Sequence, residues 1–392
     1  MGSTIELGRK PLPSLLAPPL LAAALFLGLL GVIGSVRISA APAAPAAPAA
    51  SVEQNAAAVL QSEEDWFVQN TVLPTGPSVT AYPGNLKVVP YFANLAFEGL
   101  VQNPKEIRRV GEWIAWYLDH INAADRWGVH GSIYNYKVSG EGELAPLPEY
   151  DSADAYAATF LTLAWHYISA GGSPAVLSGR EKDVLHVAQS IQDVMDRDGL
   201  TWAKSDYHIK FLMDNIEVWR GLTDLASLLD KLYGDVAAAT HYRQLAETSR
   251  AAIEKAFWMG SGWRIYVDGA GNGPRLDWTK WYPDATSQLW PIWTGFLATE
   301  DPRRTATWDR FNQAQPGWPD LKFGDAFPWA VVAYTAVCMG DSQRFWQYLQ
   351  AVDERFLSKG GSWPWYNAES GWLQRAIRLE LEKTKESHGV QK

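Results

Sequence analysis

Acidic residues recur along this chain, each beside the start of a segment with the pattern of an apolar helix. They are Asp151 and Asp154 in YDSADAYAATF, Asp214 and Glu217 in MDNIEVWRGL, Asp284 in WYPDATSQLW, Asp325 in FGDAFPW and Glu369 in WYNAESGW. Hydrolysis of a glycosidic bond needs two carboxyl groups. One is protonated and donates to the leaving oxygen, and the other is ionised and activates water or attacks the carbon. The sequence supplies several candidates for such a pair.

Five of these acids are the candidate catalytic residues. We expect Asp154 or Glu217 to act as the general acid. We expect Asp151, Asp214 or Asp284 to act as the base or to contact the substrate.

Helix capping is the alternative explanation for each acid taken singly. A carboxylate at a helix start accepts hydrogen bonds from backbone N–H groups and is favoured by the helix dipole. Capping accounts fully for Asp301 and Asp341, which begin helices of the other kind described below. It accounts less well for Asp151 and Asp154, which lie between aromatic residues.

Aromatic residues are concentrated in the segments that lead to these acids, and the chain contains 20 Trp. An exposed aromatic ring stacks on the apolar face of a sugar, although rings that pack on one another to hold a loop give the same pattern. The predicted substrate-binding residues are Trp127, Tyr134, Tyr150, Trp202, Tyr207, Trp278, Trp281, Gln288, Asp325, Trp363 and Trp365.

Two kinds of helical segment alternate along the chain. Residues 155–170 (AYAATFLTLAWHYISA) are apolar on every face, whereas in residues 104–121 the apolar side chains Ile107, Val110, Ile114 and Leu118 form one stripe. A helix that is apolar all round must be enclosed, and a helix with one apolar stripe faces solvent. The alternation therefore predicts an all-α fold with an inner ring of helices inside an outer ring, an (α/α)6 toroid.

Six helical hairpins make up the predicted toroid. They pair residues 90–102 with 104–121, 155–170 with 180–197, 218–233 with 236–258, 285–298 with the helix that Asp301 and Pro302 begin, 326–339 with 341–357, and 366–383 with 52–70. Connections from inner to outer helices are short, and those from outer to inner helices are long. The long ones must emerge on one face, where function is usually found. A superhelical solenoid also alternates, but no fixed repeat period is present.

The N-terminal region differs from the rest of the chain. Arg9 and Lys10 precede an apolar stretch at residues 15–36 that is long enough to cross a bilayer, and residues 40–50 read AAPAAPAAPAA. We expect residues 1–39 to be a cytoplasmic tip with a single-pass signal anchor or a signal peptide, 40–51 a linker, and 52–392 the toroid. The domain is then outside the cytoplasm, held at the cell membrane or secreted after cleavage.

Several classes of function lack support. The net charge is −9 and no block of Lys or Arg occurs, so nucleic acid is not an expected partner. The seven histidines are scattered, and no HExxH motif, phosphate-binding glycine loop or GxSxG motif is present, so neither a metal nor another cofactor is expected. We expect a monomer. Tyr207, His208 and Lys210 would suit a polysaccharide lyase, although single residues of these types in a loop are usually ordinary surface residues.

With helices such as DSADAYAATFLTLAWHYISAGG and MDNIEVWRGLTDLASLL, the chain resembles the six-hairpin glycosidase superfamily over roughly residues 83–379. The resemblance implies an (α/α)6 toroid that hydrolyses or binds polysaccharides, and it matches no single family's catalytic signature. The expected function is an extracytoplasmic glycoside hydrolase with paired-carboxylate catalysis. The alternatives are a non-catalytic glycan-binding or polysaccharide-assembly protein and a polysaccharide lyase.

Overall fold

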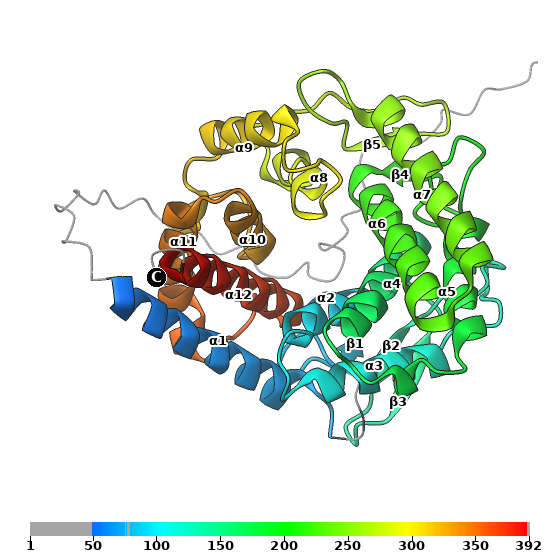
Figure 1. Cartoon of the computed structure of the whole chain (residues 1–392), viewed down its shortest axis with the longest axis horizontal. Helices are drawn as coiled ribbons and strands as arrows, with labels where there is room; N and C mark the ends of the chain where they lie inside the picture. The colour runs from blue at the N-terminus through cyan, green and yellow to red at the C-terminus, as the bar shows by residue number, and fades with distance from the viewer. Residues whose placement is uncertain (1–48, 75, 77–78, 390–392) are drawn as a thin grey trace, which may run out of the picture. The chain divides into compact units, whose positions relative to one another are not determined.

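Helices dominate the described part of the chain and are arranged in two concentric rings (Figure 1). The structure, a computed structural model, describes residues 49–74, 76 and 79–389. The inner helices are α2 (Pro90–Leu100), α4 (Ala153–Ser169), α6 (Leu212–Leu228), α8 (Trp290–Trp293), α10 (Ala330–Cys338) and α12 (Asn367–Gly389). The outer helices are α1 (Ala49–Thr71), α3 (Ile107–Asp119), α5 (Glu181–Asp193), α7 (Val236–Phe257), α9 (Pro302–Ala314) and α11 (Ser342–Arg355). The predicted all-α toroid of six hairpins is confirmed.

Burial follows the predicted distinction between the two rings. In α4 the nine residues from Ala153 to Leu161 are all buried, so this helix is enclosed on every side. In α3 the side chains of Val110, Ile114 and Leu118 are buried while Arg108 is exposed, so only one stripe faces the core.

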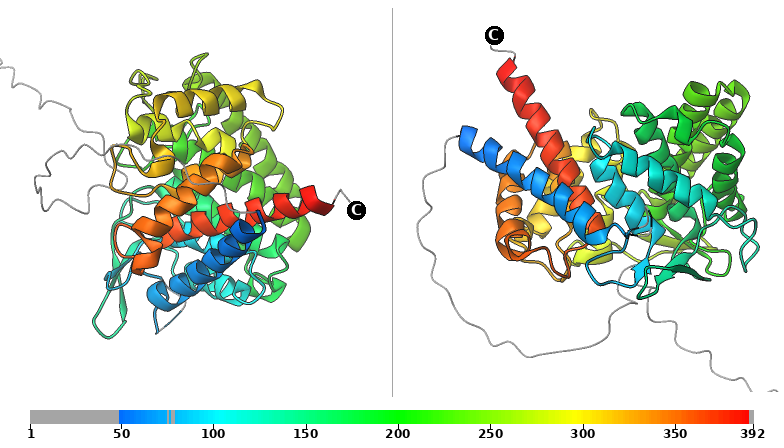
Figure 2. Two further views of the ribbon diagram at one scale, coloured as in Figure 1. Left: turned by 90° about the vertical axis from the view of Figure 1, so that its left-hand side faces the viewer. Right: turned by 90° about the horizontal axis from the view of Figure 1, so that it is seen from below.

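Helices α1 and α12 close the ring by packing against each other, as expected from their patterns (Figure 2). Neighbouring inner helices approach closely at small residues. A Cβ atom added to Gly99 of α2 would lie 2.7 Å from the Cα atom of Gly371 in α12. A Cβ atom at Gly221 of α6 would lie 2.7 Å from the Cα atom of Ala158 in α4. Any larger side chain at either glycine would push two inner helices apart.

Long loops connect each outer helix to the next inner helix and carry the strands. Strands β1 (Lys87–Val88), β2 (Asn135–Val138) and β3 (Leu144–Leu147) form one antiparallel sheet, and β4 (Ile209–Phe211) pairs with β5 (Tyr266–Asp268) in another. The first sheet joins the α1–α2 loop to the α3–α4 loop, and the second joins the α5–α6 loop to the α7–α8 loop. These loops therefore gather at the N-terminal ends of the inner helices.

Some predicted helix boundaries were wrong. Residues 285–298 do not form one helix, because Pro291 lacks an N–H group and α8 is only four residues long, preceded by a π-type turn at Trp281–Ala285. Helix α3 begins at Ile107 and not at Pro104, and Asn103 instead accepts a hydrogen bond from the Lys105 N–H in the preceding turn. Asp301 and Asp341 do cap α9 and α11, as predicted.

Residues Ala47–Lys392 form one compact unit. The predicted N-terminal anchor and most of the predicted linker lie outside the described residues, and α1 begins at Ala49, within the segment predicted as linker. Among the described helices, none is both long and apolar enough to span a bilayer.

Candidate active site

Helices α4 and α6 bring four of the five predicted catalytic acids into one group. Asp151 directly precedes α4 and Asp154 lies in its first turn, while Asp214 and Glu217 lie in the first turns of α6. Burial raises the pKa of Asp214 well above its usual value, and the charges of Asp154, Glu217 and Asp151 raise it further. The four carboxyl groups are therefore close enough to influence one another's ionisation.

Asp154 has a structural role within this group. It is completely buried, its Oδ1 accepts a hydrogen bond from the Ala155 N–H at 2.9 Å, and its Oδ2 accepts one from the Thr201 hydroxyl at 2.6 Å. Thr201 belongs to the α5–α6 loop, so Asp154 ties that loop to the start of α4. Both oxygens of Asp154 thus already accept a hydrogen bond, and its expected role as general acid stays a prediction.

Glu217 has the properties expected of a general acid. Its Oε1 accepts hydrogen bonds from the Tyr91 hydroxyl and the Trp290 indole, both at 2.9 Å. Its Oε2 is buried without a hydrogen-bond partner among the described residues. Burial raises the pKa of Glu217 to about 8. Since Oε1 already accepts two hydrogen bonds, the proton of the neutral form resides on Oε2, where it is free to be donated to a ligand.

Asp151 and Asp214 also have a buried oxygen to which no described residue donates, namely Oδ2 in each case. Burial raises the pKa of Asp151 to about 6, and this rise is limited by the charges of Lys204 and Lys87. At neutral pH Asp151 is therefore mostly ionised while Glu217 is mostly protonated. This difference is the one that acid/base catalysis requires.

Asp284 is separate from this group. Its Oδ1 accepts a hydrogen bond from the Asp277 N–H at 2.9 Å, within the loop that precedes α8. Burial raises its pKa, and none of the four acids on α4 and α6 contributes to that shift. Its expected catalytic role stays a prediction.

Glu369 stands on α12, across the ring of inner helices from α6 (Figure 1). Its two carboxylate oxygens accept hydrogen bonds from the backbone N–H groups of Trp329, at 3.1 Å, and Ala330, at 2.5 Å, where α10 begins. Burial raises the pKa of Glu369 to about 7. Glu369 thus caps a neighbouring helix, and Asp325, in the loop before that helix, accepts from the Trp329 indole at 2.9 Å.

The predicted substrate-binding residues divide into two sets. Tyr150, Trp281, Gln288 and Trp365 are buried and held by contacts within the fold, and their role in binding substrate stays a prediction. Tyr150 donates to Asp125 Oδ2 at 2.6 Å, and Trp365 donates to Glu63 Oε2 at 3.1 Å. Gln288 binds the backbone of Trp263, and the ring of Trp281 stacks on Phe323.

The other predicted aromatic residues retain exposed surface, namely Trp127, Tyr134, Trp202, Tyr207, Trp278 and Trp363. Trp363 is the most exposed of them, with 38% of its surface accessible. Aromatic side chains of the inner helices themselves, such as Tyr91 and Trp290, were not predicted as site residues, because their apolar surroundings indicated only a core position. Tyr91 and Trp290 lie at the starts of inner helices, as the acids do, and this position is the feature of the sequence that could have identified them as site residues.

The lyase hypothesis depended on a free cation at Lys210. Its ammonium group is buried and donates to Asp196 and Asp198, at 2.7 and 2.6 Å. His208 is exposed and contacts the Ser205 carbonyl at 2.8 Å. Lys210 is therefore committed to holding its loop.

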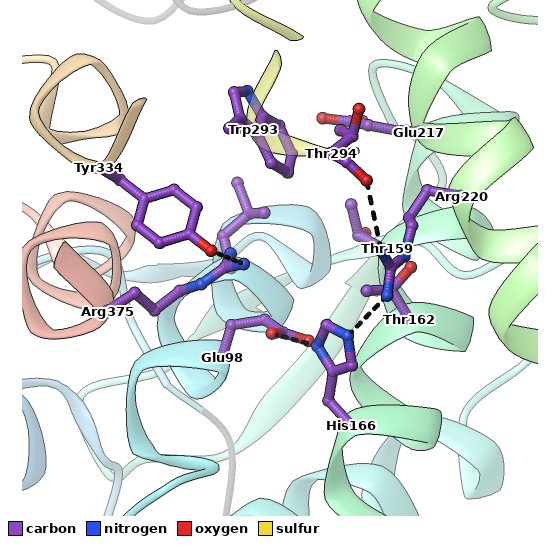
Figure 3. Close-up of a pocket in the computed structure, with 11 residues that line it drawn as sticks. Glu98, Thr159, Thr162, His166, Glu217, Arg220, Trp293, Thr294, Tyr334 and Arg375 are labelled. Carbon is purple, nitrogen blue, oxygen red and sulfur yellow. Dashed lines mark hydrogen bonds and ion pairs between the residues drawn. The ribbon is translucent and has the colours of Figure 1, made fainter. Parts of the chain in front are cut away.

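A cavity of about 270 Å³ lies on the axis of the inner ring and is lined by side chains from all six inner helices (Figure 3). Glu217 contributes to its wall, together with Glu98, His166, Arg220 and Arg375. Glu217 is therefore the member of the acid group that also borders this cavity.

No family model matches this chain, and no curated protein matches its sequence. Solved structures of glycosidases match its fold. A glycosidase variant in complex with glucose has a TM-score of 0.57 at 12% identity, over 85% of this chain and 96% of that one. The GH63 mannosylglycerate hydrolase from Thermus thermophilus, in complex with glucose, has a TM-score of 0.55 at 12% identity, over 83% of this chain and 99% of that one.

An α-amylase from Clostridium perfringens has a TM-score of 0.54 at 11% identity, over 82% of this chain and 97% of that one. These matches show that the chain shares the fold of these glycosidases.

Proposed function

We propose that this protein is an extracytoplasmic glycoside hydrolase that acts on a polysaccharide by paired-carboxylate catalysis. The observation that carries the proposal is the state of Asp151, Asp214 and Glu217. Each has one buried oxygen that no described residue donates to, and each has a raised pKa. The likeness of the fold to that of glycosidases supports the same class of reaction.

In this proposal Glu217 is the general acid. It transfers the proton on Oε2 to the glycosidic oxygen, while Tyr91 and Trp290 hold Oε1 and stabilise the carboxylate that is left behind. Asp151 is the ionised partner that activates water or attacks the anomeric carbon. Burial and the neighbouring acids raise the pKa of Asp214, which favours its neutral form, and we assign it the role of a hydrogen-bond donor to the sugar.

The cell-surface location rests on the N-terminal sequence. Its apolar stretch follows Arg9 and Lys10, which favours an exported domain. Residues 40–50 would hold the domain away from the membrane as a semi-stiff spacer. The partly exposed loop aromatics, such as Trp363 and Trp202, are the proposed platforms for the sugar chain.

The test is release of reducing ends from a panel of surface polysaccharides and oligosaccharides. The wild-type protein is compared with the double variant D151N/E217Q, which keeps the shape of both side chains and removes both proposed catalytic carboxyl groups. We expect the wild type to release sugar from at least one substrate and the double variant to release none. Equal release by the two proteins would refute the proposed catalytic residues.

A non-catalytic glycan-binding protein is the second candidate, favoured by the hydrogen bonds that occupy Asp154 and Glu369. If Glu369 only caps α10, the acid group faces no free carboxylate from the opposite side of the ring. Saturable binding of a polysaccharide without release of reducing ends would identify this second function.

A further inference from the structure

The cavity on the axis of the inner ring contains chemistry that the proposed acid/base pair does not use. Its volume of about 270 Å³ is close to the ~300 Å³ lower end of small-molecule pockets, so it has room for one sugar ring and not for an oligosaccharide. Figure 3 shows Tyr334 and Arg375 on one side of it, and Glu217 and Arg220 on the other.

Arg375 is the cation of this cavity that lacks an acidic partner. Its guanidinium group lies 4.5 Å from the ring centres of both Tyr334 and Trp372, which hold its plane, and it donates a hydrogen bond to the Tyr334 hydroxyl at 3.3 Å. No carboxylate of the described residues forms an ion pair with it. A guanidinium group has five N–H donors in a planar fork, so most of those of Arg375 are free to bind a ligand.

Arg220 provides the contrast within the same wall. Its Nε donates to Asp224 at 2.6 Å, and its two other nitrogens contact the Thr294 carbonyl at 3.3 Å and His166 Nε2 at 3.1 Å. Arginine has no acceptor, so His166 Nε2 must accept and Nδ1 carries the proton. Nδ1 then donates to Glu98 Oε2 at 2.7 Å. Each nitrogen of the Arg220 guanidinium group has a partner among the described residues, whereas only one nitrogen of Arg375 has a hydrogen-bond partner there.

Three further polar atoms in the lining have no partner in the described part of the chain. They are Glu98 Oε1, Glu217 Oε2 and Trp293 Nε1. Glu98 is only 5% exposed and Glu217 only 4%, so these oxygens have no access to bulk water. Unsatisfied groups of this kind cost about 1–3 kcal/mol each, and their convergence on one cavity indicates a missing ligand.

We propose that this cavity binds a hydroxylated carboxylate the size of one sugar ring, with its carboxylate on Arg375 and its hydroxyl groups on Glu98 and Glu217. A planar carboxylate matches the guanidinium fork through two parallel hydrogen bonds. One hydroxyl group supplies the donor that Glu98 Oε1 lacks, and another accepts a hydrogen bond from the protonated Oε2 of Glu217. Glu98 repels a carboxylate and accepts from hydroxyl groups, so it orients the ligand.

Such a ligand has two sources. One is an acidic sugar residue of the substrate, which rests on the proposed function. The other is a free sugar acid that binds beside the catalytic residues.

The first experiment compares D-glucuronate with D-glucose by isothermal titration calorimetry on the full-length chain. The two probes differ mainly in a carboxylate that replaces a hydroxymethyl group. We expect glucuronate to bind roughly 10- to 150-fold more tightly, the range for a hydrogen bond to a charged group. Equal affinity for the two probes would overturn the proposal, whatever any variant shows.

Variants then test whether Arg375 is responsible for the tighter binding of glucuronate. Arg375→Gln should abolish it, and Arg375→Lys should keep only part of it, because an ammonium group retains the charge without the planar fork. Arg344→Gln, an exposed arginine on α11, is the matched control and should leave it unchanged. Thermal unfolding checks that each variant is folded. A folded Arg375→Gln protein with the full preference would overturn the assignment of Arg375.

The kinetics of glycoside hydrolysis distinguish an acidic sugar of the substrate from a free sugar acid. If the carboxylate belongs to the substrate, glucuronate competes with a glucuronide substrate, and Arg375→Gln lowers kcat/KM for that substrate more than for the matching glucoside. If the ligand is a free sugar acid, glucuronate inhibits hydrolysis of both glycosides, and Arg375→Gln leaves the ratio of their kcat/KM values unchanged. If no glycoside is hydrolysed, the proposed function fails, while a preference for glucuronate in calorimetry still supports this site.

Discussion

The acids on the α4–α6 side of the ring and those on the α10–α12 side lie near the starts of their helices, yet their hydrogen bonds differ. Glu217 and Asp214 each have an oxygen that no described side chain or backbone group satisfies. Glu369 has both oxygens on the N–H groups that begin α10, and Asp325 accepts from Phe327 and Trp329. The first pair is available to a ligand, whereas the second pair holds the wall together.

The difference arises because the oxygens of Glu369 are occupied by the first backbone N–H groups of another helix, α10. The first N–H groups of a helix have no partner within the helix. At α10 they are satisfied by an acid from a different helix, Glu369. Asp301 and Asp341 instead accept from N–H groups of the helices that they themselves begin. The position of an acid in the sequence is therefore compatible with capping its own helix, capping another, or catalysis.

Of the substitutions that test the difference between the two sides of the ring, Glu217→Gln should have the largest effect on hydrolysis. The amide keeps the shape and the Oε1 acceptor but has no acidic proton, so we expect kcat/KM for hydrolysis to fall about 10²- to 10⁴-fold, with thermal stability retained. The measurement is steady-state kinetics on the best substrate of the panel. A folded variant with wild-type kinetics would remove Glu217 from the mechanism.

Glu369→Ala should act mainly on stability. It leaves the N–H groups of Trp329 and Ala330 without their acceptor, at about 1–3 kcal/mol each, so we expect the free energy of unfolding to fall by about 2–4 kcal/mol. Denaturant titration measures the change, and Glu354→Ala, on the exposed face of α11, is the control. If stability is unchanged and hydrolysis is lost, Glu369 belongs with the catalytic acids and the two sides of the ring are alike.

The pH dependence of hydrolysis should reflect the split between Glu217 and Asp151. Burial raises the pKa of Glu217 to about 8 and that of Asp151 to about 6. The acid must be protonated and the base ionised, so kcat/KM should be bell-shaped, falling about tenfold per pH unit below about 6 and above about 8. A profile that is already falling between pH 5 and 6 as the pH rises would contradict this assignment.

Thr201→Val should have the smallest effect, and it tests the structural role of Asp154. Removal of the hydroxyl leaves Asp154 Oδ2 buried without its donor, so we expect a loss of about 1–2 kcal/mol in the free energy of unfolding. Thr201→Ser keeps the donor and serves as the control. The alkaline limb of the pH profile should stay in place, and a shift of that limb would make Asp154 the general acid after all.

The sequence pattern predicted the helices with continuous periodicity most accurately. Helix α7 begins at Val236 and α9 at Pro302, as expected from their patterns and from the cap at Asp301. The single helix predicted over residues 285–298 was wrong, because apolar composition alone does not reveal where a buried helix begins and ends. Predictions about the N-terminal anchor, the location of the domain and its oligomeric state stay predictions.

The candidate site was predicted in part. The grouping of Asp151, Asp154, Asp214 and Glu217 follows from the adjacency of inner helices in a toroid, which the alternation predicted. The structural roles of Gln288 and Trp365 did not follow, since their partners, Trp263 and Glu63, are far away in the sequence. Arg375 and His166 were absent from the predicted site for the same reason.

By itself, the sequence determined the toroid, the face on which the long loops gather and the acids that surround that face. These features depend on periodicity and on the direction of each helix, which are local properties of the chain. Only the tertiary structure decided which acids are free, because a hydrogen-bond partner can come from any helix of the ring. Glu217 and Glu369 are alike as residues at the starts of inner helices, and the neighbours that fold against them give one a free oxygen and the other none.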